Sequence, residues 1–255
     1  MNYIGIDIGS TAAKVCLLKG DEKVFFKLPT GWSSLETANL IKEKLKTFGV
    51  DLSKDDSRVV ATGYGRVAVD YADFVITEIT CHGRGGRQLA GDNIGIIDLG
   101  GQDTKAILLE NGLVKDFLMN DKCSAGTGKF LEVMANKLVV SIDQLFKLAQ
   151  VGQVLPISSL CTVFAESEII SYIGQGQKRE DIAAGVVDSV AAKVSQLARR
   201  LDLPKDIILT GGLSGIDYFA QVLSEKLEAN VRTTENGIYA GALGAALLAK
   251  EKKKR

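Results

Sequence analysis

The chain has no excess of charge of either sign, because its 255 residues include 31 Lys or Arg and 31 Asp or Glu. Nucleic acids and anionic membranes attract basic surfaces, so this balance predicts neither as a partner. No apolar run approaches the ~20 residues that span a bilayer. The first residues, MNYIGIDIGS, lack the charged start and apolar core of a signal peptide. We therefore expect a cytoplasmic protein.

Cysteine is also scarce. The four cysteines are Cys16, Cys81, Cys123 and Cys161, and no two of them form a C-x-x-C pair. A cytosolic chain rarely carries structural disulfides. Spacing alone therefore predicts four small, buried hydrophobic residues, and any other role must be argued from the neighbouring sequence.

Alternating apolar residues and glycine turns predict strands in two stretches of the chain. The first, residues 3–28, contains three strands in an antiparallel meander, followed by a helix from about Ser33. The second, residues 93–120, repeats the order of strand, glycine turn with Asp, strand, Asn-Gly hairpin and strand. Further helices are expected near 81–90, over 127–150 and 162–200, at 216–228 and at 237–249, the last packing tightly against a sheet.

The two stretches form an internal repeat. They align at three positions: Asp7 with Asp98, Gly9 with Gly100, and Lys14 with Lys105. A repeat of this length implies two domains of like fold that face each other. We predict that residues 1–90 and 238–255 form the first domain and that residues 91–237 form the second, which carries Cys123 and Cys161.

Each copy of the repeat ends a strand with an aspartate that is followed by glycine within two residues. Two carboxylates from facing domains can hold Mg²⁺ with its waters, and glycines let backbone N–H groups approach phosphate oxygens. A single copy would fit an ordinary hairpin. The second copy and a third glycine-rich element, ILTGGLSG, favour a nucleotide site.

The segments GIDIGSTAAK, IIDLGGQDTK and IILTGGLSG resemble, in this order, the two phosphate motifs and the adenosine motif of the actin, sugar-kinase and heat-shock-chaperone ATPase superfamily. The resemblance implies an α/β fold of two ribonuclease-H-like domains with an ATP cleft between them. It implies Mg²⁺ and ATP or ADP as cofactors and catalytic roles for Asp7 and Asp98. The nucleotide-binding residues that it implies are Gly9, Ser10, Thr11, Lys14, Gly100, Gly101, Asp103, Thr104, Lys105, Gly211, Gly212 and Ser214.

Gln102 directly follows the second glycine turn. A glutamine at this point can orient a water molecule toward the γ-phosphate. Gln102 is therefore a candidate catalytic residue, and its presence favours hydrolysis over transfer to an alcohol. The alternative is that its side chain caps the turn.

The segment NDKCSAGTGKFLEVMANKL (120–138) places Cys123 before a glycine-rich turn and an apolar helix. Its GTGK is not a P-loop, because a P-loop needs glycine where Cys123 stands and Ser or Thr where Phe130 stands. Cys161 also stands at a predicted helix start. Unpaired N–H groups there favour a thiolate or a thiolate-ligated iron–sulfur cluster. Two cysteines cannot complete a four-cysteine site, but a twofold dimer supplies four.

At these residues the sequence resembles the activators (component A) of 2-hydroxyacyl-CoA dehydratases, the ATPase subunits of benzoyl-CoA reductase and the reductases of double-cubane cluster proteins, the BadF/BadG/BcrA/BcrD ATPase family. The matching pieces are IDLGGQDTK, KCSAGTGKFLE, the Cys161 segment and TEITCHGRG (77–85). The resemblance implies a homodimer with one [4Fe–4S] cluster held by Cys123 and Cys161 of each subunit. It implies an ATPase that delivers a low-potential electron to a partner iron–sulfur enzyme, flavodoxin or ferredoxin as donor, and an anaerobic setting.

Other interpretations of the residues stay open. The chain could be a small-molecule (sugar) kinase of the same fold without a cluster, or a regulatory or scaffold ATPase with core cysteines. We expect Cys16, and Cys81 with the single histidine His82, to be structural, because no further ligands cluster near them. The segment 178–180, Lys-Arg-Glu at a helix start, could contact adenine or simply face solvent.

Overall fold

The computed structural model describes all residues except 55, 158–160 and 253–255. It divides into two compact units. Unit 1 contains Met1–Ile94, Leu109–Lys115 and Glu235–Arg255, and unit 2 contains Gly95–Leu108 and Asp116–Thr234. The domain boundaries expected from the repeat stay a prediction. Residues 158–160 of the predicted Cys161 segment lie outside the described residues.

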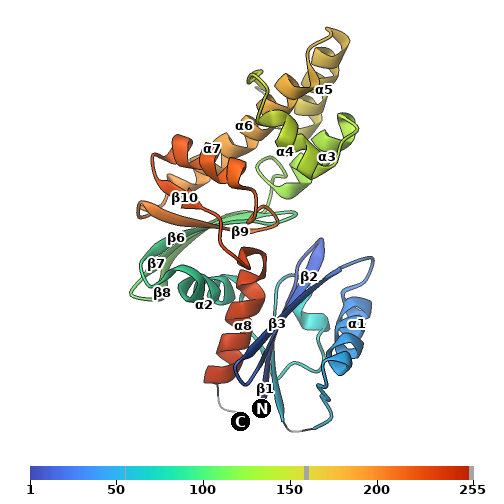
Figure 1. Cartoon of the computed structure of the whole chain (residues 1–255), viewed down its shortest axis with the longest axis vertical. Coiled ribbons are helices and arrows are strands. Elements are labelled where there is room, and N and C mark those ends of the chain that lie inside the picture. The colour runs from blue at the N-terminus through green and yellow to red at the C-terminus, as the bar shows by residue number, and fades with distance from the viewer. Residues whose placement is uncertain (55, 158–160, 253–255) are drawn as a thin grey trace. The chain divides into compact units, whose positions relative to one another are not determined.

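Unit 1 is built on a five-stranded mixed sheet with the order β3-β2-β1-β4-β5 (Figure 1). The strands are β1 (Asn2–Ile8), β2 (Ala12–Lys19), β3 (Glu22–Pro29), β4 (Ser57–Thr62) and β5 (Phe74–Val75). β1, β2 and β3 pair antiparallel, which confirms the predicted meander. β4 pairs parallel to β1 and to β5.

A second five-stranded sheet has the order β10-β9-β6-β7-β8, and most of its residues belong to unit 2. Its strands are β6 (Ile94–Leu99), β7 (Thr104–Glu110), β8 (Leu113–Asn120), β9 (Asp206–Gly211) and β10 (Asn230–Arg232). Read from β8, this order repeats that of the first sheet, which confirms the internal repeat and the α/β class. β6 is buried at every position, as expected for the central strand of a sheet. The sequence did not predict β10, because three residues are too short to show alternation.

The helices of unit 1 are α1 (Ser34–Thr47), α2 (Glu78–Ala90) and α8 (Ala240–Glu251), with short 3-10 turns at Arg66–Ala68 and Gly237–Tyr239. Ser33 caps α1 as predicted. α2 begins three residues before the predicted start, because the Thr77 side chain accepts a hydrogen bond from the Thr80 N–H. Cys81 therefore lies inside the helix and not at its start.

The helices of unit 2 are α3 (Gly128–Lys137), α4 (Ile142–Ala149), α5 (Thr162–Gly174), α6 (Arg179–Ala198) and α7 (Asp217–Leu227). α3, α4 and α5 pack against α6 (Figure 1). The predicted helical stretch 127–150 is broken where Val139 adopts a φ of 54° and Ser141 starts α4 with a capping box. The apolar pattern runs through this break, so periodicity alone did not reveal it.

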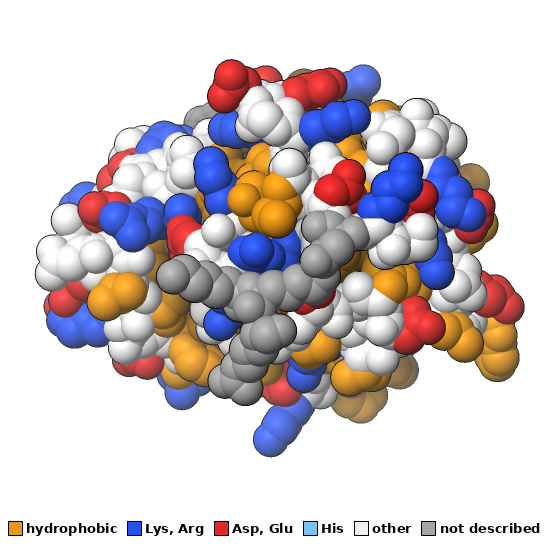
Figure 2. Space-filling model, turned by 90° about the horizontal axis from the view of Figure 1, so that it is seen from below, with side chains coloured by type: hydrophobic (Ala, Val, Ile, Leu, Met, Phe, Trp, Pro, Cys, Tyr) orange, Lys and Arg blue, Asp and Glu red, His pale blue; other side chains and the backbone are white. Residues whose placement is uncertain are grey.

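The charged side chains of the surface are mixed in sign, as the equal numbers of acidic and basic residues predict. On the face drawn in Figure 2, basic and acidic side chains are interspersed among apolar ones, and no large area carries a single sign. Among the described residues, no helix is both long and apolar enough to cross a membrane.

Tight packing of α8 on its neighbours confirms the prediction made from its small residues. A side-chain carbon added at Gly5 of β1 would overlap the Ala242 carbonyl of α8. One added at Gly85 of α2 would overlap the Ala240 carbonyl, and one at Gly244 would overlap the Cys81 carbonyl. α8 lies directly beside α2 in Figure 1. Backbone therefore touches backbone along this helix.

We expect Gly85→Ala to lower the free energy of unfolding by about 1–3 kcal/mol, because an added methyl group has no room in this contact. Alanine otherwise favours a helix by about 1 kcal/mol over glycine. Urea denaturation measures the change. The control is Gly174→Ala at the end of α5, where the added carbon meets no described atom within 4 Å. A Gly85→Ala variant as stable as this control would contradict the packing argument.

Candidate nucleotide and metal-binding site

In unit 1 the predicted phosphate turn joins β1 to β2. Asp7 is buried near the end of β1 and pairs in register with Lys14 on β2. The Lys14 Nζ lies 3.9 Å from the Asp7 Oδ2. The Gly9 N–H donates to the Ala12 carbonyl across the turn (3.2 Å). The first copy of the repeat therefore brings a carboxylate, an ammonium group and a glycine turn together.

The corresponding turn of unit 2 holds its aspartate more firmly. The Lys105 Nζ lies 3.3 Å from the Asp98 Oδ2 and 2.8 Å from the Asp103 Oδ1. All three side chains are buried, and Lys105 is only 1% exposed. The Thr210 hydroxyl donates to the Asp98 Oδ1 at 2.9 Å. The Asp98 carboxylate is thus fixed by an ammonium group on one oxygen and a hydroxyl on the other.

A second glycine turn faces each aspartate, and the sequence analysis did not match these two turns. Gly63 directly follows Thr62, the last residue of β4, and β9 ends in Thr210-Gly211, with glycine φ values of 84° and 79°. A side-chain carbon at Gly63 would overlap the carboxylate of unit 1, and one at Gly211 would lie 2.9 Å from the carboxylate of unit 2. The sequence contains a pattern that could have revealed these turns, because an apolar stretch leads into Thr-Gly at positions 62–63 and again at 210–211.

The carboxylate of unit 1 fits a hydrated cation. The Asp7 Oδ1 is buried and has no hydrogen-bond donor among the described residues. A buried acceptor of this kind normally binds a water molecule or an ion. Mg²⁺ prefers carboxylate oxygens and keeps several waters. Asp7 therefore has the chemistry needed to hold Mg²⁺ through its waters.

His82 lies beside Asp7, which the sequence analysis did not predict. A side-chain carbon at Gly241 of α8 would lie 2.8 Å from the Asp7 Oδ2 and 2.9 Å from the His82 Nε2. His82 is buried, and its Nε2 lies 3.7 Å from the Glu78 Oε1. The histidine thus belongs to the polar surroundings of Asp7 and of the first predicted phosphate turn.

The other predicted nucleotide-binding residues differ in exposure. Thr11, Gln102 and Gly212 are exposed, Asp103, Thr104, Gly211 and Ser214 are buried, and the remaining turn residues are half-buried. Among the described residues the Gln102 side chain makes no hydrogen bond to the turn, which disfavours the capping alternative. Lys178 is the N-cap of α6, and the two residues after it open that helix. Their contact with adenine stays a prediction.

The structure separates the four cysteines into two pairs. Cys16 and Cys81 are buried, whereas Cys123 and Cys161 are exposed. Cys161 is the N-cap of α5, as predicted. Cys123 is not at a helix start, because it lies in the loop four residues before Thr127, the N-cap of α3. The helix-terminus argument therefore applies to Cys161 alone.

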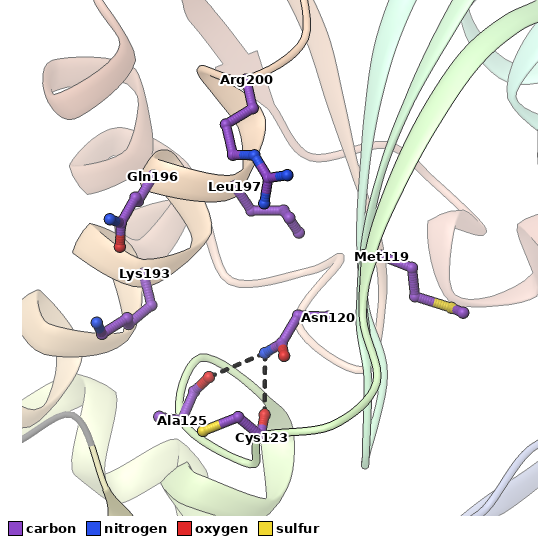
Figure 3. Close-up of a pocket in the computed structure, with 8 residues that line it drawn as sticks. All are labelled: Met119, Asn120, Cys123, Ala125, Lys193, Gln196, Leu197 and Arg200. Atoms are coloured by element: carbon purple, nitrogen blue, oxygen red, sulfur yellow. Dashed lines mark hydrogen bonds between the residues drawn. The ribbon is translucent and has the colours of Figure 1, made fainter.

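A hydrogen bond brings the two exposed cysteine segments together. The hydroxyl of Ser124, which follows Cys123, lies 2.7 Å from the hydroxyl of Thr162, which follows Cys161. The Asn120 side chain donates to the carbonyls of Cys123 (2.9 Å) and Ala125 (3.1 Å), as Figure 3 shows. Two thiols that are far apart in the sequence are thus held in one region of unit 2.

Cys123 also borders a hollow of about 370 Å³ between α6 and β8. Figure 3 shows Leu197 of α6 and Arg200, which lies just after this helix, pointing into it, and the loop of Cys123 forming one end. Solvent therefore reaches this cysteine segment.

We expect thiol labelling of the metal-free chain near pH 8 to modify two cysteines in the native state and four after unfolding. Burial raises the pKa of Cys16 and of Cys81 to about 12, so neither forms a thiolate in the folded chain at that pH. The unfolded chain ionises these thiols from about pH 8.5 upward, whereas the folded chain keeps them neutral until about pH 12. The free energy of unfolding therefore falls as the pH rises from about 8.5 toward 12. Mass spectrometry identifies the labelled residues. Rapid native labelling of Cys16 would contradict this assignment.

Comparison with known proteins gives a consistent result over the full chain. The sequence model of the BadF/BadG/BcrA/BcrD ATPase family matches residues 4–249. The (R)-2-hydroxyglutaryl-CoA dehydratase activating ATPase of Acidaminococcus fermentans is 42% identical over 254 residues, which cover 98% of this chain and 97% of that protein. The activator of lactoyl-CoA dehydratase of Anaerotignum propionicum is 43% identical, and the match covers 98% of each chain.

Solved structures give the same result. The activator of the 2-hydroxyisocaproyl-CoA dehydratase from Clostridium difficile with bound ADPNP superimposes with a TM-score of 0.90 at 37% identity, covering 100% of this chain and 99% of that one. A ROK family glucokinase from Streptomyces griseus, at a TM-score of 0.62 and 16% identity, covers 99% of this chain and 100% of that one and shows the fold alone. The predicted actin-like ATPase fold is confirmed. With a family match over residues 4–249 and full-length relatives above 40% identity, the chain belongs to the BadF/BadG/BcrA/BcrD ATPase family.

Proposed function

We propose that this protein is an ATPase that uses ATP hydrolysis to transfer a low-potential electron from a [4Fe–4S] cluster at a homodimer interface to a partner iron–sulfur enzyme. The observation that carries the proposal is the Ser124–Thr162 hydrogen bond (2.7 Å), which joins the segments of two exposed cysteines. These segments belong to the same unit as a phosphate turn. Relatives named as dehydratase activators support the proposal.

Cys123 and Cys161 would hold the cluster, and the same two residues of a second copy would complete its four ligands. When bound, the cluster would supply a one-electron carrier. The outer face of α5, directly after Cys161, supports pairing with a second copy. Val163, Phe164, Ile170 and Ile173 are 66%, 67%, 52% and 47% exposed on this helix. Several large apolar side chains exposed on one helix are a feature of interaction surfaces.

The two aspartate turns would bind the phosphates of ATP. Asp7 and Asp98 would hold Mg²⁺ through its waters, and the glycines at positions 9, 100 and 101, which carry no side chain, would let phosphate oxygens approach the backbone of the turns. Exposed Gln102 would orient the attacking water. Gly211, Gly212 and Ser214 would contact adenosine.

Hydrolysis would provide enough free energy for an unfavourable electron transfer. Moving one electron costs about 1.4 kcal/mol per ~59 mV. A gap of about 300 mV therefore needs about 7 kcal/mol, which is within reach of coupled ATP hydrolysis.

Relatives that activate dehydratases support a 2-hydroxyacyl-CoA dehydratase as the partner. A benzoyl-CoA reductase or a double-cubane cluster protein would accept an electron by the same chemistry. Flavodoxin or ferredoxin is the proposed donor. A cluster at an exposed interface reacts with oxygen, so we propose a cytoplasmic role in an anaerobic cell.

The coupling between hydrolysis and electron transfer can be tested with ADPNP, a nucleotide that is not hydrolysed. Anaerobic protein is mixed with reductant and an acceptor dehydratase, and the number of electrons delivered per dimer is measured. We expect many turnovers with ATP and at most one with ADPNP. Sustained turnover with ADPNP would overturn the coupling. A Gln102→Ala variant should lower the ATP-driven rate by about 10²-fold, since it removes the group that orients water.

A further inference from the structure

The glycines of the GTG sequence after Cys123 pack on the phosphate turn of unit 2. The Gly128 N–H donates to the Gly100 carbonyl at 3.0 Å, and the Lys129 N–H donates to the Gly101 carbonyl at 2.8 Å. A side-chain carbon on Gly128 would lie 3.0 Å from the Gly100 carbonyl oxygen, so the turn would have to shift to admit it. Glycine at this position allows the start of α3 to rest directly on the turn.

A buried threonine makes a second connection between the same two segments. The Thr104 hydroxyl donates to the Gly126 carbonyl at 2.6 Å. Thr104 follows the phosphate turn and is 2% exposed. Its hydroxyl is therefore directed at the cysteine loop, although the sequence suggested that it binds nucleotide. Gly126 has a φ of 86°, and a side-chain carbon there would lie 2.9 Å from the Lys193 Cβ, so this position requires glycine.

The connection continues from the loop to both cysteines. The buried Thr127 hydroxyl donates to the Ser124 carbonyl at 2.7 Å. The Ser124 hydroxyl is hydrogen-bonded to the Thr162 hydroxyl at 2.7 Å, and Thr162 is the first residue of α5 after Cys161. Five hydrogen bonds thus lead from Gly100, Gly101 and Thr104 to the residues that adjoin Cys123 and Cys161.

We propose that these contacts couple the phosphate turn to the two cysteine segments. A change in the nucleotide bound at the turn then changes the distance between the Cys123 and Cys161 thiols. Gly128, Ser124 and Thr162 are the positioning residues. The inference rests on the proposed function for what the thiols hold. The hydrogen bonds described above, all within one chain, control the distance between the two thiols.

The test measures thiol separation in the metal-free, full-length protein, so that no redox activity enters the readout. A bifunctional thiol reagent of fixed length cross-links Cys123 to Cys161, and peptide mass spectrometry selects the product within one chain. The cross-linking rate is compared with saturating ADP and with saturating ADPNP, after calorimetry has confirmed that both bind. We expect the two rates to differ by about fivefold or more, the lower end of usual coupling between two sites.

Two pairs of matched variants test the contacts themselves. Gly128→Ala should bring the two rates to within about twofold of each other, whereas Gly174→Ala, the same change where no described atom lies within 4 Å, should keep the wild-type ratio. Ser124→Ala should have the same effect as Gly128→Ala. Its control is Ser167→Ala, because within the described part of the chain the Ser167 hydroxyl donates only to the Val163 carbonyl of the same helix, α5. Ser124→Ala keeps the test valid if Gly128→Ala fails to fold.

Equal rates in the wild-type protein, or a wild-type ratio retained in both Gly128→Ala and Ser124→Ala, would overturn the inference. The cluster proposal would survive that result if the protein still assembled iron. Loss of nucleotide binding or of iron in the wild-type protein would instead contradict the proposed function. The two failures are therefore distinguishable.

Discussion

Cys123→Ser is expected to remove the iron of the anaerobically purified protein while nucleotide affinity stays within about twofold of wild type. A serine hydroxyl does not replace a thiolate in such a cluster, and loss of one ligand in each chain removes two of the four. The mutated side chain is exposed, so the fold should not change. Iron analysis and the visible absorbance of the cluster measure the first effect, and calorimetry with ADPNP measures the second.

The matched control for this prediction is Cys16→Ala. Cys16 is fully buried in β2, so its replacement should cost about 1–2 kcal/mol of stability and leave the iron content unchanged. Equal iron in Cys123→Ser and wild type would show that the exposed cysteines do not hold a cluster.

Lys105→Met should be among the most destabilising single changes in the chain. Its ammonium group lies 3.3 Å from Asp98 and 2.8 Å from Asp103, and all three side chains are buried. Methionine fills similar space but leaves two carboxylates without their shared cation. Breaking a buried pair in this way costs about 3–5 kcal/mol. Thermal and urea unfolding measure the loss, and ATP hydrolysis should fall with it because Asp98 is no longer held.

The repeat offers a natural control in the other copy. Lys14 is the counterpart of Lys105, but its Nζ lies 3.9 Å from Asp7 and its side chain is 18% exposed. Water reaches this pair, so Lys14→Met should cost clearly less than Lys105→Met. Adding Asp103→Asn to Lys105→Met should restore part of the lost stability, since one buried charge is removed. Equal losses for Lys14→Met and Lys105→Met would contradict this account of the buried pair.

Sequence reasoning predicted the fold because its signals were repeated and local. Asp7 with Lys14 and Asp98 with Lys105 stand at equal spacing in two similar stretches, and both pairs lie beside glycine turns in the structure. The small residues of α8 also predicted close packing correctly. They let neighbouring backbones touch, as at Gly85, where an added side-chain carbon would overlap the Ala240 carbonyl.

What the sequence could not predict depends on contacts between distant residues. The Ser124–Thr162 hydrogen bond joins positions 38 residues apart, and no periodicity connects two hydroxyl groups. His82 lies next to Asp7 only because Gly241 of α8 packs between them, from the other end of the chain. The Thr-Gly pairs at 62 and 210 were visible as a motif, but their contact with the aspartates required the sheet order.

The central claim is that two copies of this chain share one iron–sulfur cluster, and the most direct test combines two measurements on wild-type protein purified without oxygen. Analytical ultracentrifugation gives the number of subunits, and chemical analysis gives the iron per chain. We predict a brown dimer with about four iron atoms, two for each chain. A colourless protein without iron would contradict the claim, and phosphorylation of a sugar by that protein would support the kinase alternative instead.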